Sequence, residues 1–420
     1  MNTKIASGKY KRFKIILAAL ILFALSCISP FEPDYGGKAD LLVVDGSLIK
    51  GIDKQVINIS RSSSILIPRY QEAKYRPEVN CKVKITDDSG NEFLFTEESE
   101  GKYVANIDDA HLKYDTNYKL EFSTASGEKY ESGYQRLLKT APVDSIYAIK
   151  EYLYSADVNQ ENTRVLQFYV DLDAPDDASK YYKWQVEETW ENRASYKLGG
   201  FYDGSIITLY DLDSPSDSLF YCWETEIANG IFTASTVSLS QNEIKKIPLH
   251  FKLSYLKSLI VKYCATVRQF ALNKDAYEYW HQKEVELTES GEIYTNQPFQ
   301  PKSNIYNISN PDEKVLGFFW ASSCTLKRIF VENPFDNDSG LENRCDSLKA
   351  CTTLTDLDIL AYLYAFIAYN KRISRFPGPP PVFFYVTLGA FDSVCFYFTK
   401  DECVDCRIRG GTTQKPDFWQ

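Results

Sequence analysis

The stretch Cys81-Lys82-Val83-Lys84-Ile85-Thr86-Asp87-Asp88-Ser89-Gly90-Asn91-Glu92-Phe93-Leu94-Phe95-Thr96 indicates how this chain folds. Cys81, Val83 and Ile85 alternate with polar residues, as on the buried face of a β-strand. Residues 87–91 are rich in Asp, Ser, Gly and Asn, which favours a tight turn, and residues 92–96 suit the returning strand. We therefore expect antiparallel β structure built from short strands.

Similar short strands lie on both sides of this hairpin. Residues 41–48, 56–59, 101–104 and 118–122 are rich in aliphatic and aromatic residues, and turn residues separate them. Such spacing predicts an immunoglobulin-like or fibronectin-like β-sandwich over residues 39–142. Asp115-Thr116-Asn117-Tyr118-Lys119-Leu120 also resembles the tyrosine corner of those sandwiches.

The composition changes after residue 142, where helical patterns join the strands. Asn273 can cap a helix that extends to about residue 288, and residues 355–369 favour a second helix. Two further strands are expected at residues 382–386 and 394–398. We predict a mainly β protein, in which the sandwich is followed by a larger, β-rich α+β domain over residues 143–420.

The N-terminus has the features of a bacterial lipoprotein signal. Five basic residues precede an apolar stretch at residues 15–25, and Ala24-Leu25-Ser26 leads directly to Cys27. We expect residues 1–26 to be a signal peptide, Cys27 to carry lipid, and residues 27–38 to form a lipidated tether. The alternatives are a secretory signal that is cut nearby, or a membrane anchor with an incidental cysteine.

Charge and aromatic content limit the classes of partner. The chain of 420 residues has a net charge of -10 and an isoelectric point near 5.1, which argues against nucleic-acid binding. Aromatic residues make up 15% of the sequence. Most of them should lie in the core or on sheet surfaces, although some could stack against a sugar or another flat ligand.

Nine cysteines remain when Cys27 is set aside, and most of them lie in the second half of the chain. In an exported protein these thiols are expected to pair. Cys81 is the exception, because it belongs to a buried strand face. Cys403 and Cys406 have the spacing of half a zinc site, but in an oxidising compartment we expect each to form a disulfide with a separate, distant partner. The candidate disulfide cysteines are Cys222, Cys264, Cys324, Cys345, Cys351, Cys395, Cys403 and Cys406.

Motifs for catalysis or for cofactor binding are not found in the sequence. The three histidines, His111, His250 and His281, lack a neighbouring nucleophile motif or zinc-helix spacing, and there is no glycine-rich phosphate loop. Catalytic residues and a cofactor are therefore not predicted, although paired carboxylates for glycoside hydrolysis remain open. One acidic cluster favours a solvated acidic turn, because it lacks the residue order of a calcium-binding hand, with a calcium site as the alternative: Asp171, Asp173, Asp176 and Asp177.

Several segments together resemble the signature blocks of the DUF4249 family. The C-terminal block is the most specific, with Cys403-Val404-Asp405-Cys406-Arg407 followed by Gly410 and by Lys415-Pro416-Asp417-Phe418-Trp419. The other blocks are Leu42-Val43-Val44-Asp45-Gly46, Tyr181-Tyr182-Lys183-Trp184, Cys222-Trp223-Glu224-Thr225, Ala276-Tyr277-Glu278-Tyr279-Trp280, Asn304-Ile305-Tyr306-Asn307 and Val315-Leu316-Gly317-Phe318-Phe319. Cys264 and Cys324 do not belong to this pattern.

The resemblance implies a Bacteroidota outer-membrane lipoprotein, on the periplasmic or the cell-surface side. Members of the family are often encoded beside TonB-dependent receptors, so it implies a binding or accessory partner of such a transporter. The ligand, whether a small molecule, a glycan or a peptide, stays open. Two other functions are a cell-surface hydrolase of glycans or peptides, and a structural component of envelope assembly.

Overall fold

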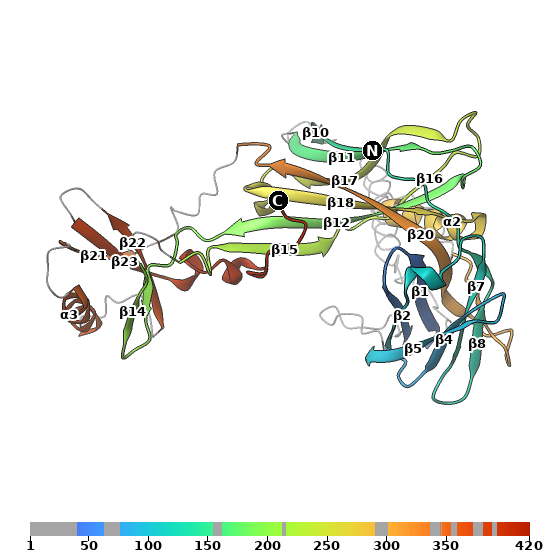
Figure 1. Cartoon of the computed structure of the whole chain (residues 1–420), viewed down its shortest axis with the longest axis horizontal. Coiled ribbons are helices and arrows are strands. Elements are labelled where there is room, and N and C mark those ends of the chain that lie inside the picture. Colours follow the sequence, from blue (N-terminus) through green and yellow to red (C-terminus); the bar gives the residue numbers. More distant parts are fainter. Residues whose placement is uncertain are drawn as a thin grey trace, which may run out of the picture. The chain divides into compact units, whose positions relative to one another are not determined.

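The structure is a computed structural model, and it describes the chain from residue 40 onward with gaps. The described residues are 40–62, 76–153, 162–211, 216–289, 301–336, 345, 347–353, 359–372, 381–388 and 393–420. Every element named below belongs to one compact unit. The described strands form three sheets, and the largest of them contributes to two separate cores (Figure 1).

The first sandwich is one part of the large sheet folded around a core. Its strands follow the order β1-β2-β6-β5-β4-β7-β8-β19, with β3 paired to β2 and β9 paired to β7. Alternate residues, such as Val83 and Ile85 of β4, are buried in this core. The elements are β1 (Leu42–Lys50), β2 (Lys54–Arg61), β3 (Arg76–Pro77), β4 (Lys82–Asp87), β5 (Glu92–Ser99), β6 (Lys102–Asn106), the short helix η1 (Asp109–His111), β7 (Asn117–Ser123), β8 (Lys129–Ser132), β9 (Gln135–Arg136) and β19 (Ile305–Asn307).

A single long strand, β20 (Val315–Glu332), joins the first sandwich to the second. Its first half runs parallel to β1, from the pair Leu42 and Val315 onward, and its second half pairs antiparallel with β18. Gly317 allows β1 and β20 to approach closely, because its φ is +102° and an added Cβ would lie 1.7 Å from the Val44 carbonyl oxygen. β20 therefore contributes residues to the cores of both sandwiches.

The second sandwich packs the three-stranded sheet β10-β11-β17 against β12, β18 and β20. Trp184 of β12 and Phe168 of β11 are buried at its centre. Its further elements are β10 (Ser145–Leu153), β11 (Thr163–Asp173), β12 (Tyr181–Arg193), β15 (Tyr221–Ile227), β16 (Phe232–Ser235), β17 (Glu243–Leu253), the short helix η2 (Lys257–Leu259), β18 (Lys262–Ala271) and helix α2 (Lys274–Glu289).

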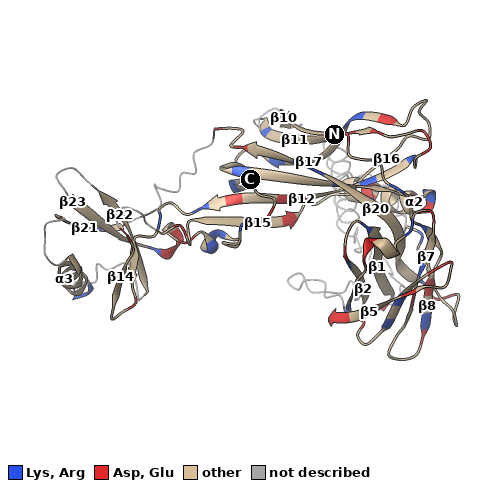
Figure 2. Ribbon diagram, viewed as in Figure 1, with Lys and Arg blue, Asp and Glu red and all other residues tan. Residues whose placement is uncertain are grey.

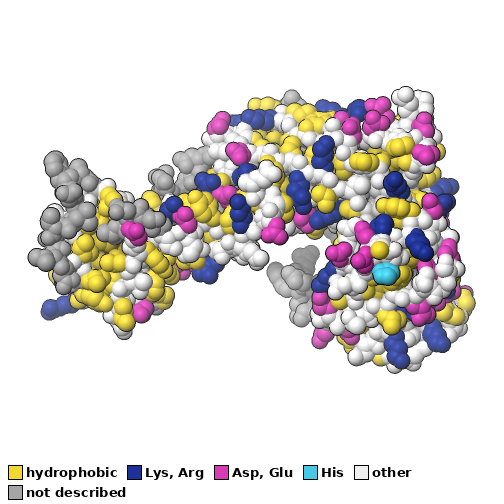
Figure 3. Space-filling view, in the orientation of Figure 1, with side chains coloured by type: hydrophobic (Ala, Val, Ile, Leu, Met, Phe, Trp, Pro, Cys, Tyr) yellow, Lys and Arg dark blue, Asp and Glu magenta, His cyan; other side chains and the backbone are white. Residues whose placement is uncertain are grey.

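A third, smaller core lies between helix α3 and a five-stranded sheet, which we call the small sheet. Figures 2 and 3 show that charged residues are sparse and hydrophobic side chains are frequent around β14 in this part of the chain. A tail that contains the short helices η4 (Asp401–Cys403) and η5 (Cys406–Arg409) follows. The strands of the small sheet are β13 (Gly200–Tyr202), β14 (Ile207–Leu209), β21 (Ser347–Thr353), β22 (Val382–Leu388) and β23 (Ser393–Thr399), and helix α3 comprises Ile359–Arg372.

The structure confirms a mainly β protein with few helices. Asn273 caps α2 as predicted, because its side-chain oxygen accepts a hydrogen bond from the Ala276 amide at 2.8 Å. The buried Tyr118 hydroxyl accepts a hydrogen bond from the Lys113 amide, which is the contact expected of a tyrosine corner. The immunoglobulin-like classification itself stays a prediction.

The core of the first sandwich extends beyond residues 39–142, over which the sandwich was predicted. Ile305 of β19 and Val315 and Phe319 of β20 are buried in it, beside residues of β1 and β2. β20 pairs with the edge of β1 that lies away from β2, so the backbone groups on both sides of β1 are hydrogen-bonded. The segment 39–142 therefore lacks two strands of its own core.

Candidate binding cleft

A cleft of about 730 Å³ lies where the C-terminal tail meets the β15-β12-β18-β20 end of the large sheet. It combines aromatic rings with charged side chains of both signs. Its lining residues are Glu191, Arg193, Tyr221, Trp223, Ile260, Val261, Lys262, Glu332, Asn333, Asp336, Lys415, Trp419 and Gln420.

A disulfide and a pair of backbone hydrogen bonds hold the tail beside β15. Cys222 is bonded to Cys406, and the amide and carbonyl of Trp223 both pair with Thr412, at 2.8 and 2.9 Å. Gly411 precedes this pair with a φ of +93°, and an added Cβ would lie 2.6 Å from the Trp223 carbonyl oxygen. Glycine is therefore required for the tail to approach β15 this closely.

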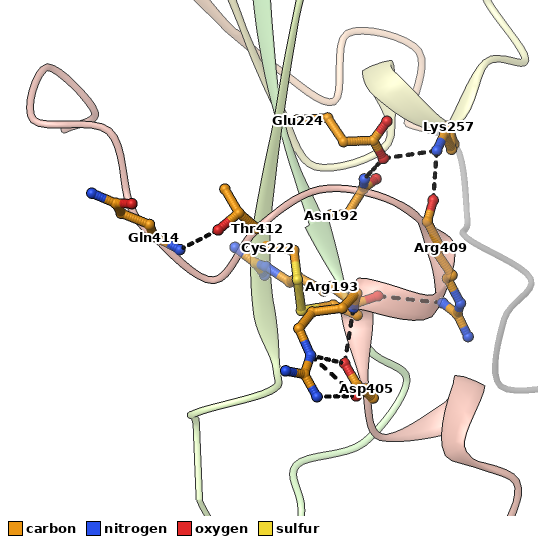
Figure 4. The surroundings of a disulfide bond; sticks show 11 residues. Asn192, Arg193, Cys222, Glu224, Lys257, Asp405, Arg409, Thr412 and Gln414 are labelled. Atoms are coloured by element: carbon orange, nitrogen blue, oxygen red, sulfur yellow. Dashed lines mark hydrogen bonds and ion pairs between the residues drawn. A yellow bond between two sulfur atoms is a disulfide. The ribbon is translucent and has the colours of Figure 1, made fainter.

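Polar contacts around the disulfide fix the tail further (Figure 4). The Glu224 carboxylate accepts a hydrogen bond from Lys257 Nζ at 2.8 Å and another from the side-chain amide of Asn192. Lys257 Nζ also donates to the Arg409 carbonyl oxygen at 2.8 Å, so one lysine bridges β15 and the tail. In the tail itself, the Asp405 carboxylate forms an ion pair with Arg407, which lowers the pKa of Asp405 even though burial opposes that shift.

The last residues of the chain form one wall of the cleft. Trp419 is only 4% exposed, and its indole Nε1 donates to Glu191 Oε2 at 3.3 Å. Arg193 Nε lies 2.6 Å from the other carboxylate oxygen of Glu191. Lys262 Nζ donates to the Gln420 backbone oxygen at 2.8 Å and pairs with Glu332 at 3.2 Å. Glu191, Arg193 and Lys262 are therefore each held by a polar contact within the chain.

This arrangement suits the binding of a polar, partly flat molecule. Tyr221 supplies an aromatic ring to the lining, the Arg193 guanidinium lies over this ring at 5.4 Å, and the charged side chains offer both donors and acceptors. The buried indole N–H of Trp223 has no hydrogen-bond partner among the described residues. None of the described residues that line the cleft is Ser, Cys or His.

Sequence comparison identifies the family. The family model described as a domain of unknown function, DUF4249, matches residues 28–328. The chain belongs to the DUF4249 family. No curated protein matches the chain. The matched residues contribute β12, β15 and β18 to the cleft of this DUF4249 protein, whereas the tail lies beyond the match.

Three disulfides occur among the described residues of the DUF4249 chain, and they use six of the eight candidate cysteines. Cys403 and Cys406 reach separate, distant partners, as predicted. The pairs are Cys222–Cys406, Cys345–Cys403 and Cys351–Cys395. The two cysteines that have the spacing of half a zinc site therefore both belong to disulfides, as predicted.

The other two candidates, Cys264 and Cys324, are not paired, which corrects the prediction for them. In the antiparallel pair of β18 and β20, Cys264 lies opposite Phe330 while Cys324 lies opposite Phe270. Six residues along a strand separate these positions, a distance of about 20 Å. Burial raises the pKa of each thiol to about 11. Cys81 is buried and unpaired, as predicted.

The candidate calcium site is not assembled. The Asp171 carboxylate accepts hydrogen bonds from the Tyr147 hydroxyl at 3.1 Å and from the Lys246 amide at 2.8 Å. Asp173, Asp176 and Asp177 are exposed, and the described residues contain no group of three or more metal ligands. Both donors belong to the neighbouring strands β10 and β17, so the Asp171 carboxylate is engaged within the sheet.

Two features of the prediction concern the membrane. Cys27 and the signal peptide lie outside the described residues. Within the described part of the chain, no helix is both long and apolar enough to cross a membrane.

The sequence did not predict a buried polar cluster that the structure contains. His250 Nε2 lies 2.7 Å from the Tyr263 hydroxyl and 3.3 Å from Glu188 Oε1, and Glu188 also contacts Lys252 Nζ. Burial lowers the pKa of His250 to about 3 and raises the pKa of Glu188. These residues come from β12, β17 and β18, so no local motif could have indicated that they meet.

Proposed function

We propose that this protein is an outer-membrane lipoprotein that binds a ligand in the C-terminal cleft as the accessory partner of a TonB-dependent transporter. The observation that supports ligand binding is the cleft itself, in which Tyr221 and Trp223 lie beside fixed charges. The lipoprotein signal at Cys27 and the family resemblance support the membrane location and the partner.

The absence of Ser, Cys and His among the described lining residues favours binding over acyl-transfer chemistry at this site. Binding needs only contacts that are held in place, and the disulfide together with the bond between Trp419 and Glu191 provides such fixation. The lipid on Cys27 would keep the cleft close to a transporter in the same membrane.

Affinity purification from the native membrane tests the partner. The protein with Cys27 intact should copurify with a TonB-dependent receptor, whereas the Cys27→Ala variant should lose both the membrane fraction and the receptor. Metabolic labelling with palmitate provides the matched control for lipidation. A purification of the intact protein that contains no β-barrel receptor would contradict the proposal.

A hydrolase is the second candidate function, because the cleft gathers three carboxylic side chains. Glu191, Glu332 and Asp336 all line it, and paired carboxylates hydrolyse glycosides. Incubation of the protein with envelope polysaccharides and with peptides, followed by mass spectrometry of the products, tests this function. Cleavage that the Glu332→Gln variant lacks would favour the hydrolase, and unchanged substrates would count against it.

A further inference from the structure

The outward half of helix α3 is apolar. Its exposed positions follow helical spacing, so they form one continuous face along the helix. The side of a helix that faces water normally carries charged and polar residues. This face is therefore suited to apolar surroundings, and we call it the α3 face. Its apolar residues are Leu360, Ala361, Tyr364, Ala365, Ala368 and Tyr369.

The other half of α3 is held by the small sheet. Leu363 and Ile367 are buried in the core beneath the helix. On the α3 face, the Tyr364 hydroxyl accepts a hydrogen bond from the Ile207 amide at 3.0 Å. This bond brings Ile206, another exposed apolar residue, next to the face. The α3 face is therefore presented by a packed helix and extends onto the residue that precedes β14.

Charge occurs only at the C-terminal end of α3 (Figure 2). Lys371 and Arg372 are basic, and Ile359–Arg372 contains no acidic residue, although the chain as a whole has a net charge of -10. Both basic residues are exposed, and Lys371 Nζ lies 4.5 Å from the centre of the Tyr202 ring. An apolar face with a basic end is complementary to a lipid surface that carries negative headgroups.

The size of the α3 face favours a lipid surface over a protein partner. A helix of 14 residues is about 21 Å long and about 10 Å wide, so one face offers roughly 200 Å². A stable protein interface buries about 800 Å² on each partner. A bilayer requires no matching partner surface, and it accepts the shallow insertion of one helix face.

The residue types of the α3 face point to the same partner. Tyr364 and Tyr369 each combine an apolar ring with a polar hydroxyl, which suits the boundary between the hydrocarbon and the headgroups of a bilayer. With 14 residues, α3 is too short to cross a bilayer. A helix of this length and pattern lies in the plane of the membrane surface.

We propose that the α3 face binds the surface of a lipid bilayer that contains anionic headgroups. Leu360 and Tyr369 insert at the edge of the hydrocarbon, and Arg372 lies beside the headgroups. Such a contact is weak and reversible on its own, and it adds to any other membrane anchor of the chain. It is separate from the C-terminal cleft and needs neither the ligand of the cleft nor a lipid on Cys27.

Vesicle flotation with a chain that lacks other membrane signals tests this contact. The chain from residue 28 onward contains every described residue, but neither the apolar stretch at residues 15–25 nor Cys27. It should float with vesicles made of equal parts of phosphatidylcholine and phosphatidylglycerol. Binding to vesicles of phosphatidylcholine alone should be weaker, because these vesicles have no net negative charge.

A double variant on α3 and a matched double variant on α2 identify the face. Leu360→Glu combined with Tyr369→Glu removes two apolar side chains and adds charges that anionic headgroups repel, so binding should fall about tenfold or more. Val285→Glu combined with Leu287→Glu is the control and should bind like the parent chain. These residues are 37% and 60% exposed, close to the 41% and 64% of Leu360 and Tyr369.

Two further measurements separate the contributions of charge and of folding. Arg372→Gln should weaken binding to the mixed vesicles about fivefold, because it removes one cation near the headgroups. Thermal unfolding should show the same midpoint for every variant, since each replaced side chain is exposed. Hydrogen exchange needs no variant, because bound vesicles should slow the exchange of the α3 amides in the parent chain.

Several results would overturn the proposal. These are a parent chain that does not bind the mixed vesicles, a double variant on α3 that binds them equally well, an equal loss in the α2 control, and α3 amides that vesicles leave unprotected. Light scattering that shows a dimer which the α3 double variant abolishes would also overturn it, since the occupant would then be a second copy.

Discussion

Cys222 of β15 is bonded to Cys406 of η5, across a sequence separation of 184 residues. The next residue of β15, Trp223, pairs through its backbone with Thr412. Together these contacts hold the last residues of the chain against the large sheet, and Trp419 and Gln420 of this tail line the binding cleft. The disulfide is therefore one of the contacts that position this wall of the cleft.

Removal of this disulfide should destabilise the protein and loosen the tail. The double variant Cys222→Ala with Cys406→Ala should lower the free energy of unfolding by about 2–4 kcal/mol, because the bond constrains a long loop in the unfolded chain. Chemical denaturation measures the loss, and hydrogen exchange should become faster over residues 410–420.

The Cys351–Cys395 bond of the small sheet offers the matched control. Replacement of both of its cysteines by alanine should also lower stability, but exchange in the tail should stay slow. If exchange in the tail is the same with and without the Cys222–Cys406 bond, the bond does not hold the cleft.

A methyl group at Gly317 should separate β1 from β20. Gly317→Ala should cost more than about 2 kcal/mol, because its Cβ would meet the Val44 carbonyl oxygen and its backbone is left-handed. Gly90→Ala is the control, since Gly90 has a φ of +88° but nothing within 4 Å of an added Cβ. Urea denaturation should show a clearly larger loss for Gly317→Ala, and equal losses would refute the close approach.

The buried His250 should make the protein less stable in acid. Its pKa in the folded state is about 3, whereas an unfolded histidine titrates near 6.5, so the unfolded chain binds the extra proton first. The contribution of neutral His250 to the free energy of unfolding is fully present above about pH 6.5. This contribution is lost as the pH falls toward 3, and it amounts to something on the order of a few kcal/mol.

The substitution His250→Phe should remove that part of the pH dependence. Phenylalanine keeps the stacking on Phe168, whose ring centroid lies 4.6 Å from that of His250. The raised pKa of Glu188 acts in the opposite sense, since protonation of Glu188 in acid relieves the cost of its buried charge. Unfolding free energies measured from pH 7 to pH 4 should therefore fall more steeply for the wild type than for His250→Phe, and parallel curves would contradict this assignment.

Local patterns in the sequence were enough to predict strands and helix caps. The alternation of Cys81, Val83 and Ile85 and the cap at Asn273 depend on neighbours a few residues away, and both are observed. The parallel pairing of β1 with β20 joins Leu42 to Val315, and nothing local to either strand encodes that partner. The boundary of the first sandwich could not be predicted for this reason.

Only some residues of the candidate site could be predicted from the sequence. The sequence indicated that Cys403 and Cys406 would form disulfides, but the choice of Cys345 and Cys222 as partners depends on the folded chain. Glu191 and Trp419 showed no pattern typical of a binding site. They meet because the tail returns to β12, a contact between residues far apart in the sequence.

The central claim is that the C-terminal cleft binds a ligand, and arrays of glycans and peptides probed with the Cys27→Ala chain test it most directly. A ligand found in this way should bind Tyr221→Ala about tenfold more weakly, because Tyr221 lines the cleft. Tyr255→Ala, which removes a ring that is 69% exposed and is not part of the cleft lining, should bind normally. Equal affinity of wild type and Tyr221→Ala for that ligand, or no binding to any array component, would contradict the account.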